Sequence, residues 1–156
     1  MRKILIVEDD HGVAVAIQKF LRHKHCDSVI AESGLQGLAA VEQSSFDLAV
    51  IDLGMLGMDE SETLGAFRKR APTLPIVVMT GYVFSHTRGP PPDFAGMAAM
   101  LGANYCLPKP IRARHLLDAI EGCLTRRAND ATGAASQAAA RRSGPDTPRR
   151  TTSENG

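Results

Sequence analysis

The chain has 156 residues, a length that suits one domain with some chain to spare, and its 44% hydrophobic content can supply a core. Its formal net charge of +1 argues against a strongly charged partner. The three cysteines form no CxxC pair, and no apolar run is long enough for a membrane span or a secretory signal, which predicts a reduced, cytoplasmic protein.

Strand and helix patterns alternate from residue 4 to residue 124. Short apolar runs bounded by turn residues predict buried strands at 4–7, 28–31, 48–51, 75–79 and 105–107. Apolar residues at helical spacing predict helices around 13–21, 35–41, 64–67, 94–101 and 116–124. Five strands alternating with five helices predict an α/β fold, a doubly wound, flavodoxin-like parallel sheet in the order 2-1-3-4-5 with helices on both faces.

Four of the predicted strands end on residues with useful chemistry. The first is followed by Glu8 and Asp9, the third by Asp52, the fourth by Thr80 and the fifth by Lys109. In this strand order the carboxyl ends of the parallel strands meet at one edge of the sheet, where open α/β sheets bind ligands. We therefore expect these side chains to converge, which is more specific than any one of them alone.

The stretch 46–60, FDLAVIDLGMLGMDE, is central to this arrangement. Residues 48–51 form a continuous branched run that suits a strand buried on both faces, and the run stops on Asp52. Gly54 and Gly57 follow, so the chain should leave the sheet in a loop. A carboxylate in that place must find a cation or hydrogen-bond donors, or lose its charge. Asp52 could equally cap the following turn, and this stretch alone leaves both interpretations open.

The residue types at this edge suit phosphoryl transfer with a divalent metal. Three clustered carboxylates, those of Glu8, Asp9 and Asp52, repel one another unless they bind a hard cation. Mg²⁺ takes one or two carboxylates and keeps waters for a phosphate. With the metal in place, one carboxylate can act as nucleophile toward a phosphoryl group. The Thr80 hydroxyl and the Lys109 ammonium are then suited to hold the phosphoryl oxygens.

Other residues at this edge have a backbone role or a plainer interpretation. Gly54 and Gly81 let the backbone come close to the same phosphoryl group. Asp9 or Asp10 could cap the first helix, and we expect Asp10 to do little more than that. Lys109 could be an ordinary solvated lysine, although its place between two prolines after a strand argues against it.

Four motifs occur together in this sequence. They are ILIVEDD at 4–10, DLAVIDLGMLGMD at 47–59, PIVVMTG at 75–81 and GANYCLPKP at 102–110. Together they resemble the receiver domain of bacterial two-component response regulators, over roughly residues 1–124.

The resemblance implies a role for each matching residue. Asp52 would be the phosphoacceptor, with Asp9 binding Mg²⁺ directly and Glu8 through water. The Gly54 carbonyl would supply a further metal ligand. Thr80 would be the switch hydroxyl, and Lys109 would pair with the phosphate and form a cis bond to Pro110.

The sequence departs from the family pattern in several places. Leu56 stands where the family usually has proline, and Glu60 where it often has glycine. Cys106 occupies the usual aromatic switch position, and Tyr105, one residue earlier, should point to the opposite face of the sheet. The loop between Thr80 and Lys109, with its prolines at 90–92, is longer than usual, which we interpret as altered partner contact.

The last part of the chain differs from the rest in composition. From 125 to 156 it contains no Val, Ile, Leu, Met, Phe, Tyr or Cys, and six arginines stand against three acids. We therefore expect a receiver domain at 1–124 and a disordered Arg/Ala-rich tail at 125–156, with no second output domain. The tail's charge would give at most weak, salt-sensitive contact with nucleic acid.

Two classes of function compete on this evidence. The first is a stand-alone phosphoacceptor switch, not an enzyme, whose partners are a sensor histidine kinase or histidine phosphotransfer protein and a downstream protein, with no membrane partner. The second is a metal-dependent phosphatase with an aspartate nucleophile. That phosphatase class needs a second aspartate two positions after the first, and Gly54 stands there, which favours the switch.

Overall fold

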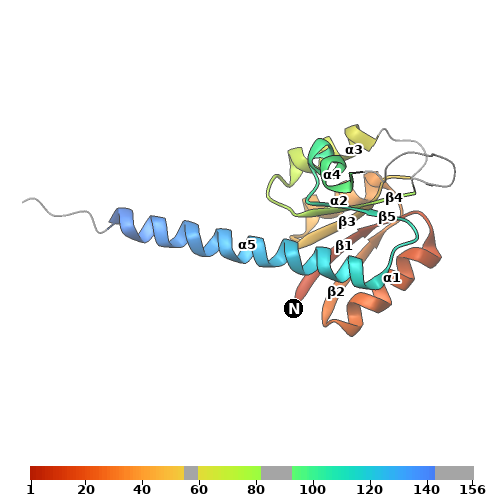
Figure 1. Ribbon diagram of the computed structural model, residues 1–156, viewed down its shortest axis with the longest axis horizontal. Coiled ribbons are helices and arrows are strands. Elements are labelled where there is room, and N and C mark those ends of the chain that lie inside the picture. The colour runs from red at the N-terminus through yellow and green to blue at the C-terminus, as the bar shows by residue number, and fades with distance from the viewer. Residues whose placement is uncertain (55–59, 82–92, 143–156) are drawn as a thin grey trace, which may run out of the picture.

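The computed structural model describes residues 1–54, 60–81 and 93–142, and the chain forms a five-stranded parallel sheet in the order β2-β1-β3-β4-β5 (Figure 1). The strands are β1 (Arg2–Val7), β2 (Cys26–Ala31), β3 (Leu48–Asp52), β4 (Ile76–Thr80) and β5 (Tyr105–Pro108). The helices are α1 (His11–His23), α2 (Gly34–Gln43), α3 (Glu60–Arg70), α4 (Phe94–Leu101) and α5 (Ala113–Arg142). The predicted fold class and strand order are confirmed.

The sheet is buried on both faces, as its apolar strands predicted. One core cluster joins alternate strand residues such as Leu5 and Val7 to side chains of α2, α3 and α4. The other joins Ile4 and Ile6 to α1 and α5. All residues of β3 and β4 are buried, which a strand covered by helices on both sides requires.

Side-chain caps begin two of the helices next to the first two strands. Asp10 accepts a hydrogen bond from the Val13 backbone N–H at 3.0 Å, so it caps α1 as expected. Ser33 accepts one from the Gln36 N–H at 3.2 Å and caps α2. The α1 cap matters for the site, because it fixes the turn that follows Glu8 and Asp9.

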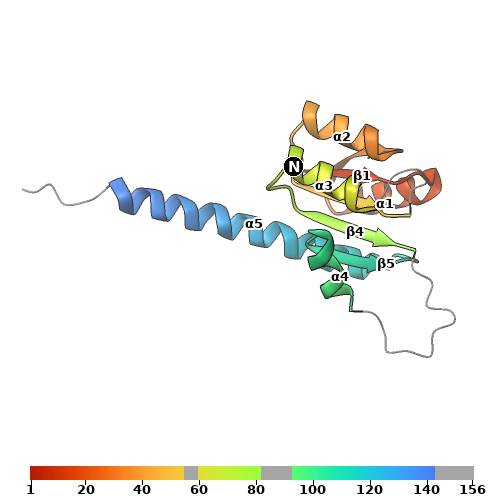
Figure 2. The same ribbon diagram turned by 90° about the horizontal axis from the view of Figure 1, so that it is seen from above.

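The last helix is longer than the sequence predicted. We expected it to end at 124, but α5 continues to Arg142 and projects well beyond the sheet (Figures 1 and 2). Residues 125–135 are exposed, so intrinsic propensity accounts for this part of the helix, which is rich in alanine and arginine. Within 125–142 we expected at most a transient helix at 134–140, whereas α5 runs through this part to Arg142. The remainder of the expected tail, 143–156, lies outside the described residues.

Two of the departures from the family pattern noted in the sequence cannot be compared with the structure. The proline-rich segment 89–92 and the family-variant position 56 lie outside the described residues. None of the helices in the described part of the chain is long and apolar enough to cross a membrane.

The packing of α2 gives a test of the fold with two glycines in helices. A Cβ on Gly37 would lie 2.8 Å from Cγ2 of Val7 and 2.9 Å from Cζ of Phe67, whereas a Cβ on Gly65 meets nothing within 4 Å. Gly37→Ala should lower the free energy of unfolding by about 1–3 kcal/mol, because α2 must move away from Val7 and Phe67. Gly65→Ala should raise it by about 0.5–1 kcal/mol through helix propensity alone.

Urea denaturation of both variants measures the difference. Equal stabilisation by the two alanines would show that α2 does not pack against Val7 and Phe67 as described.

Candidate functional site

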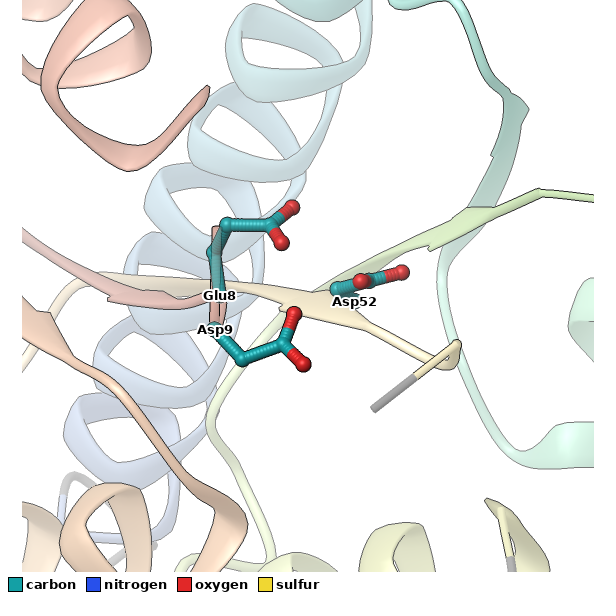
Figure 3. A group of neighbouring side chains, drawn as sticks. All are labelled: Glu8, Asp9 and Asp52. Carbon is teal, nitrogen blue, oxygen red and sulfur yellow. The ribbon is translucent and has the colours of Figure 1, made fainter. Parts of the chain in front are cut away.

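Three carboxylates meet at the carboxyl edge of the sheet. The register of β1 against β3 pairs Val7 with Ile51, so Glu8 and Asp52 come next to each other at the strand ends. One oxygen from each of Glu8, Asp9 and Asp52 lies within 4.8 Å of the others, and Figure 3 shows Glu8 and Asp9 reaching toward the side where Asp52 lies. Glu8 is fully buried and Asp52 is 4% exposed, while Asp9 is open to solvent.

Lys109 is the cation that faces these acids. Its Nζ lies 2.9 Å from Oδ2 of Asp52 and 3.0 Å from Oε2 of Glu8. The residue is held in place by its own backbone N–H, which donates to the Thr80 carbonyl at 2.7 Å, and its bond to Pro110 is cis, as the resemblance implied. Lys109 is therefore not an ordinary solvated lysine.

Burial and pairing shift two pKa values in the cluster. Burial raises the pKa of Glu8, and the neighbouring Asp52 charge adds to this, against the opposing hydrogen bonds from Lys109 and the Asp10 N–H. Burial by itself would lower the pKa of Lys109, but its hydrogen bonds to Asp52 and Glu8 outweigh that effect and raise it. The ammonium consequently stays charged, and it faces more carboxylates than it can neutralise.

The donor set fits a hard divalent cation. Carboxylate oxygens from Glu8, Asp9 and Asp52 are the kind of ligand that Mg²⁺ prefers, and one ammonium leaves excess negative charge for a metal to offset. Gly54 runs beside Asp52, since its N–H donates to Asp52 Oδ1 at 3.0 Å. A Cβ there would lie 3.5 Å from the same oxygen, so glycine leaves room above the carboxylate. Asp52 thus does cap the turn that follows it, and the same carboxylate also pairs with Lys109.

The fourth strand brings two further expected residues to this edge. β4 pairs with β3 so that Met79 stands opposite Asp52, and Thr80 is the next residue. Thr80 is 9% exposed, and Gly81 beyond it is exposed with open space where a Cβ would be. The structure therefore places Thr80 and Gly81 at the same edge as the carboxylates and Lys109.

Residues 105 and 106 lie on opposite faces of the sheet, as strand alternation predicted. Cys106 is buried in the core shared with α2, α3 and α4. Tyr105 packs on the side of α5, where a Cβ on Gly122 would lie 2.3 Å from its hydroxyl. Cysteine thus fills the position where the resembling family usually has an aromatic side chain.

One contact of the site was not predicted from the sequence. Lys109 binds Glu8 as well as Asp52, across 101 residues of chain. The predicted strand order places both residues at one edge, but no local sequence pattern predicts which acids the Lys109 side chain will contact. The pairing becomes visible only once β5 is placed beside β4.

The chain is similar to known signalling proteins over this whole region. The sequence model of the response regulator receiver domain matches residues 4–121. The response regulator protein FleR of Pseudomonas aeruginosa is 35% identical over 118 residues, which are 76% of this chain and 24% of that protein. The transcriptional regulatory protein CpxR homolog of Haemophilus influenzae is 31% identical over 129 residues, 83% of this chain and 53% of that protein.

Solved structures agree with the sequence relatives. A CheY-like response regulator receiver domain protein from Methanospirillum hungatei has a TM-score of 0.71 and 26% identity, covering 83% of this chain and 98% of its own. A receiver domain from Clostridium thermocellum has a TM-score of 0.69 and 25% identity. The chain spans about a quarter of the length of FleR, so the relatives have parts that this alignment does not reach.

Because Lys109 pairs with two buried acids, we expect the fold to be less stable when the lysine is replaced. Lys109→Met should lower the free energy of unfolding of the metal-free protein by about 3 kcal/mol, because Glu8 and Asp52 lose their buried partner. Mg²⁺ should restore part of the loss, and so should Asp52→Asn in the Lys109→Met background. Denaturant titration in EDTA and in Mg²⁺ measures both effects.

Lys19→Met is the matched control, since Lys19 is an exposed lysine of α1. It should change stability by less than about 0.5 kcal/mol. If the two lysine variants were equally stable in EDTA, the ammonium would not be neutralising the cluster.

Proposed function

The chain belongs to the response regulator receiver domain family, and from that membership we propose that Asp52 accepts a phosphoryl group from a sensor histidine kinase or a histidine phosphotransfer protein. The observation that carries the proposal is the nearly buried Asp52 carboxylate, set between two further acids and the Lys109 ammonium. A buried aspartate with only a structural role would not need two more carboxylates beside it. As a receiver domain, the chain would act as a phosphoacceptor switch in a two-component system.

The metal-binding residues of the proposal are Glu8, Asp9, Asp52 and the carbonyl of Gly54. When bound, Mg²⁺ supplies positive charge that offsets the clustered carboxylates and the developing charge on the phosphoryl group. The fit rests on the hard oxygen ligands of the three acids. The exposed Asp9 leaves the cluster open to solvent on one side, where a hydrated ion can enter.

The transfer step follows from the groups around Asp52. A carboxylate oxygen of Asp52 attacks the phosphorus, and the bond from phosphorus to the donor breaks, with its electron pair leaving on the donor. The Lys109 ammonium, which binds Asp52 Oδ2 before the reaction, is in reach to pair with a phosphoryl oxygen afterward. Gly54 and Gly81 keep side chains away from the approach, and their backbone can contact the phosphoryl group.

Thr80 is the residue we propose to report the phosphorylated state. It ends β4 at the same edge, and its hydroxyl would turn toward the phosphoryl oxygens at Asp52. Cys106 is too small to act as the bulky plug of related domains, so the change would pass through the backbone after Thr80. Most of that loop, 82–92, lies outside the described residues.

We also propose that the switch acts on a downstream protein and that the receiver domain occupies 1–124, although α5 continues beyond it and Arg127 contacts Phe46 and Asp47. The phosphatase alternative has less support, because Gly54, two positions after Asp52, carries no acid for a general-acid step.

The phosphoacceptor assignment predicts a specific loss of labelling. In Mg²⁺ the wild-type protein should be labelled by acetyl phosphate, and EDTA should abolish the labelling because the acids then repel the phosphoryl group. Asp52→Asn should not be labelled, since an amide cannot form the acyl phosphate. Mass spectrometry of the intact protein measures the added phosphoryl group.

Asp10→Asn is the matched control for this substitution, because Asn caps a helix as well as Asp does. It should be labelled like the wild type. Undiminished labelling of Asp52→Asn would falsify the assignment.

The proposed switch predicts that Thr80 and Cys106 differ in importance. Thr80→Ala should still be phosphorylated, but phosphorylation should no longer change the affinity for the downstream partner, because the hydroxyl that senses the phosphoryl oxygens is gone. Cys106→Ala should leave this coupling almost intact. The measurement compares partner affinity before and after phosphorylation for both variants, and a large loss of coupling in Cys106→Ala alone would sink the idea.

A further inference from the structure

Three arginines gather at the amino ends of β4 and β5, the sheet edge opposite to Asp52. A cavity of about 620 Å³ there is lined by Arg68, Arg126 and Arg127, with Asp130 as its single acid. One wall is α5 and the other is the turn 72–75 before β4, so the arginines line a hollow and not a flat surface. A second cavity of about 310 Å³, which includes Ser44 and Ser45 in its lining, adjoins it across Arg127.

The Arg68 guanidinium is partly buried, and among the residues that the structure describes only neutral oxygens bind it. It donates to the carbonyls of Gly102 and Leu74 and to the side-chain oxygen of Asn104. Within the described residues no carboxylate lies within 4.0 Å of it. Burial accordingly lowers the pKa of Arg68, as expected for a cation without a counter-charge. The Gly102 and Leu74 carbonyls hold the Arg68 guanidinium in place but, being neutral, do not cancel its positive charge at the cavity.

The two arginines of α5 are also short of negative partners. The Arg126 guanidinium lies 5.8 Å from the centre of the Tyr105 ring, and in the described part of the chain it makes no hydrogen bond or ion pair. Arg127 donates to the carbonyls of Phe46 and Asp47 and comes only within 3.9 Å of Asp47 Oδ1. Asp130 forms no ion pair with either arginine. The cavity therefore holds more positive than negative charge.

We propose that this cavity binds the phosphate group of a small phosphorylated molecule. Arginine presents its N–H groups in a planar fork that matches phosphate oxygens, and Arg126 makes no hydrogen bond to any described residue. The size of the cavity suits a small ligand, and Leu74, Pro72 and Pro75 give it an apolar wall. The site lies at the sheet edge away from Asp52, because Pro75 and Asn104 in its lining come just before β4 and β5, whereas Thr80 and Lys109 lie at or beyond the far ends of these strands.

The test titrates the 156-residue chain with inorganic pyrophosphate and, separately, with ADP. Both are added in EDTA and at constant ionic strength, so that the carboxylate site cannot bind them through a metal. Amide NMR shifts of Thr73, Asn104 and Asp130 should change along a saturable curve, while those of Thr80 and Lys109 should not. Equal affinities would assign recognition to the phosphates alone, and tighter binding of ADP would add a contact to the nucleoside; both results support the site.

Charge variants on α5 locate the binding. Arg126→Gln should weaken pyrophosphate about tenfold, because a charged hydrogen bond is lost, and Arg126→Lys should recover only part of this. Asp130→Asn should strengthen binding, since it removes the one acid of the cavity. Arg22→Gln is the matched control, an exposed arginine of α1 outside the cavity that should leave the affinity unchanged. Among the described residues Arg126 makes no hydrogen bond, so its variants should remain folded.

Four results would overturn the proposal, three of them in these titrations. Those three are the absence of saturable binding by either probe, an equal loss in Arg22→Gln and Arg126→Gln, and shift changes confined to the Asp52 edge. Binding of duplex DNA without binding of either small probe would also overturn it, since the basic residues would then serve a polyanion surface.

Discussion

The charge balance at the carboxyl edge of the sheet is the constraint on which the site depends. Glu8 and Asp52 are buried carboxylates next to each other, and a single ammonium, that of Lys109, contacts both at 3.0 and 2.9 Å. Isolated buried charges are too costly to keep, so this pairing lets the fold retain two acids at a nearly dry position. The pairing leaves negative charge in excess, since the one positive charge of Lys109 cannot neutralise the three carboxylates of Glu8, Asp9 and Asp52. The remaining negative charge is what makes the edge attractive to a divalent ion.

The strand order makes this balance possible. Glu8 follows β1, Asp52 ends β3, and Lys109 follows β5. In the sequence Lys109 lies 57 residues after Asp52 and 101 residues after Glu8. The parallel order β2-β1-β3-β4-β5 brings all of their carboxyl ends to one side. The Lys109 N–H bond to the Thr80 carbonyl then holds the lysine beside the end of β4. An antiparallel arrangement would send alternate strand ends to opposite edges and would separate the acids from the lysine.

The sequence predicted this edge well because its signals are local. A short branched run such as Leu48–Ile51 can be buried only in a covered strand, and parallel topology follows from the alternation with helices. Asp10 indicated the start of its helix through its capping preference. The contacts made by long side chains carry no such signal: the bond from Lys109 to Glu8 and those from Arg127 to the start of β3 join residues far apart in the chain. The length of α5 was underestimated because its end was placed at the last buried apolar residue, whereas residues 125–135 are helical although exposed.

The two charged ends of the sheet are far enough apart to act separately. Leu74 lines the arginine cavity and Thr80 ends β4 at the acidic edge, and six residues of extended chain span roughly 20 Å. That is more than twice the Debye length of about 8 Å at physiological salt, so charge alone would couple exposed groups at the two edges only weakly. Any coupling would have to pass through a movement of packed elements. α5 is the element placed to transmit one, because Leu116 and Ile120 pack on the sheet while Arg126 and Arg127 line the cavity.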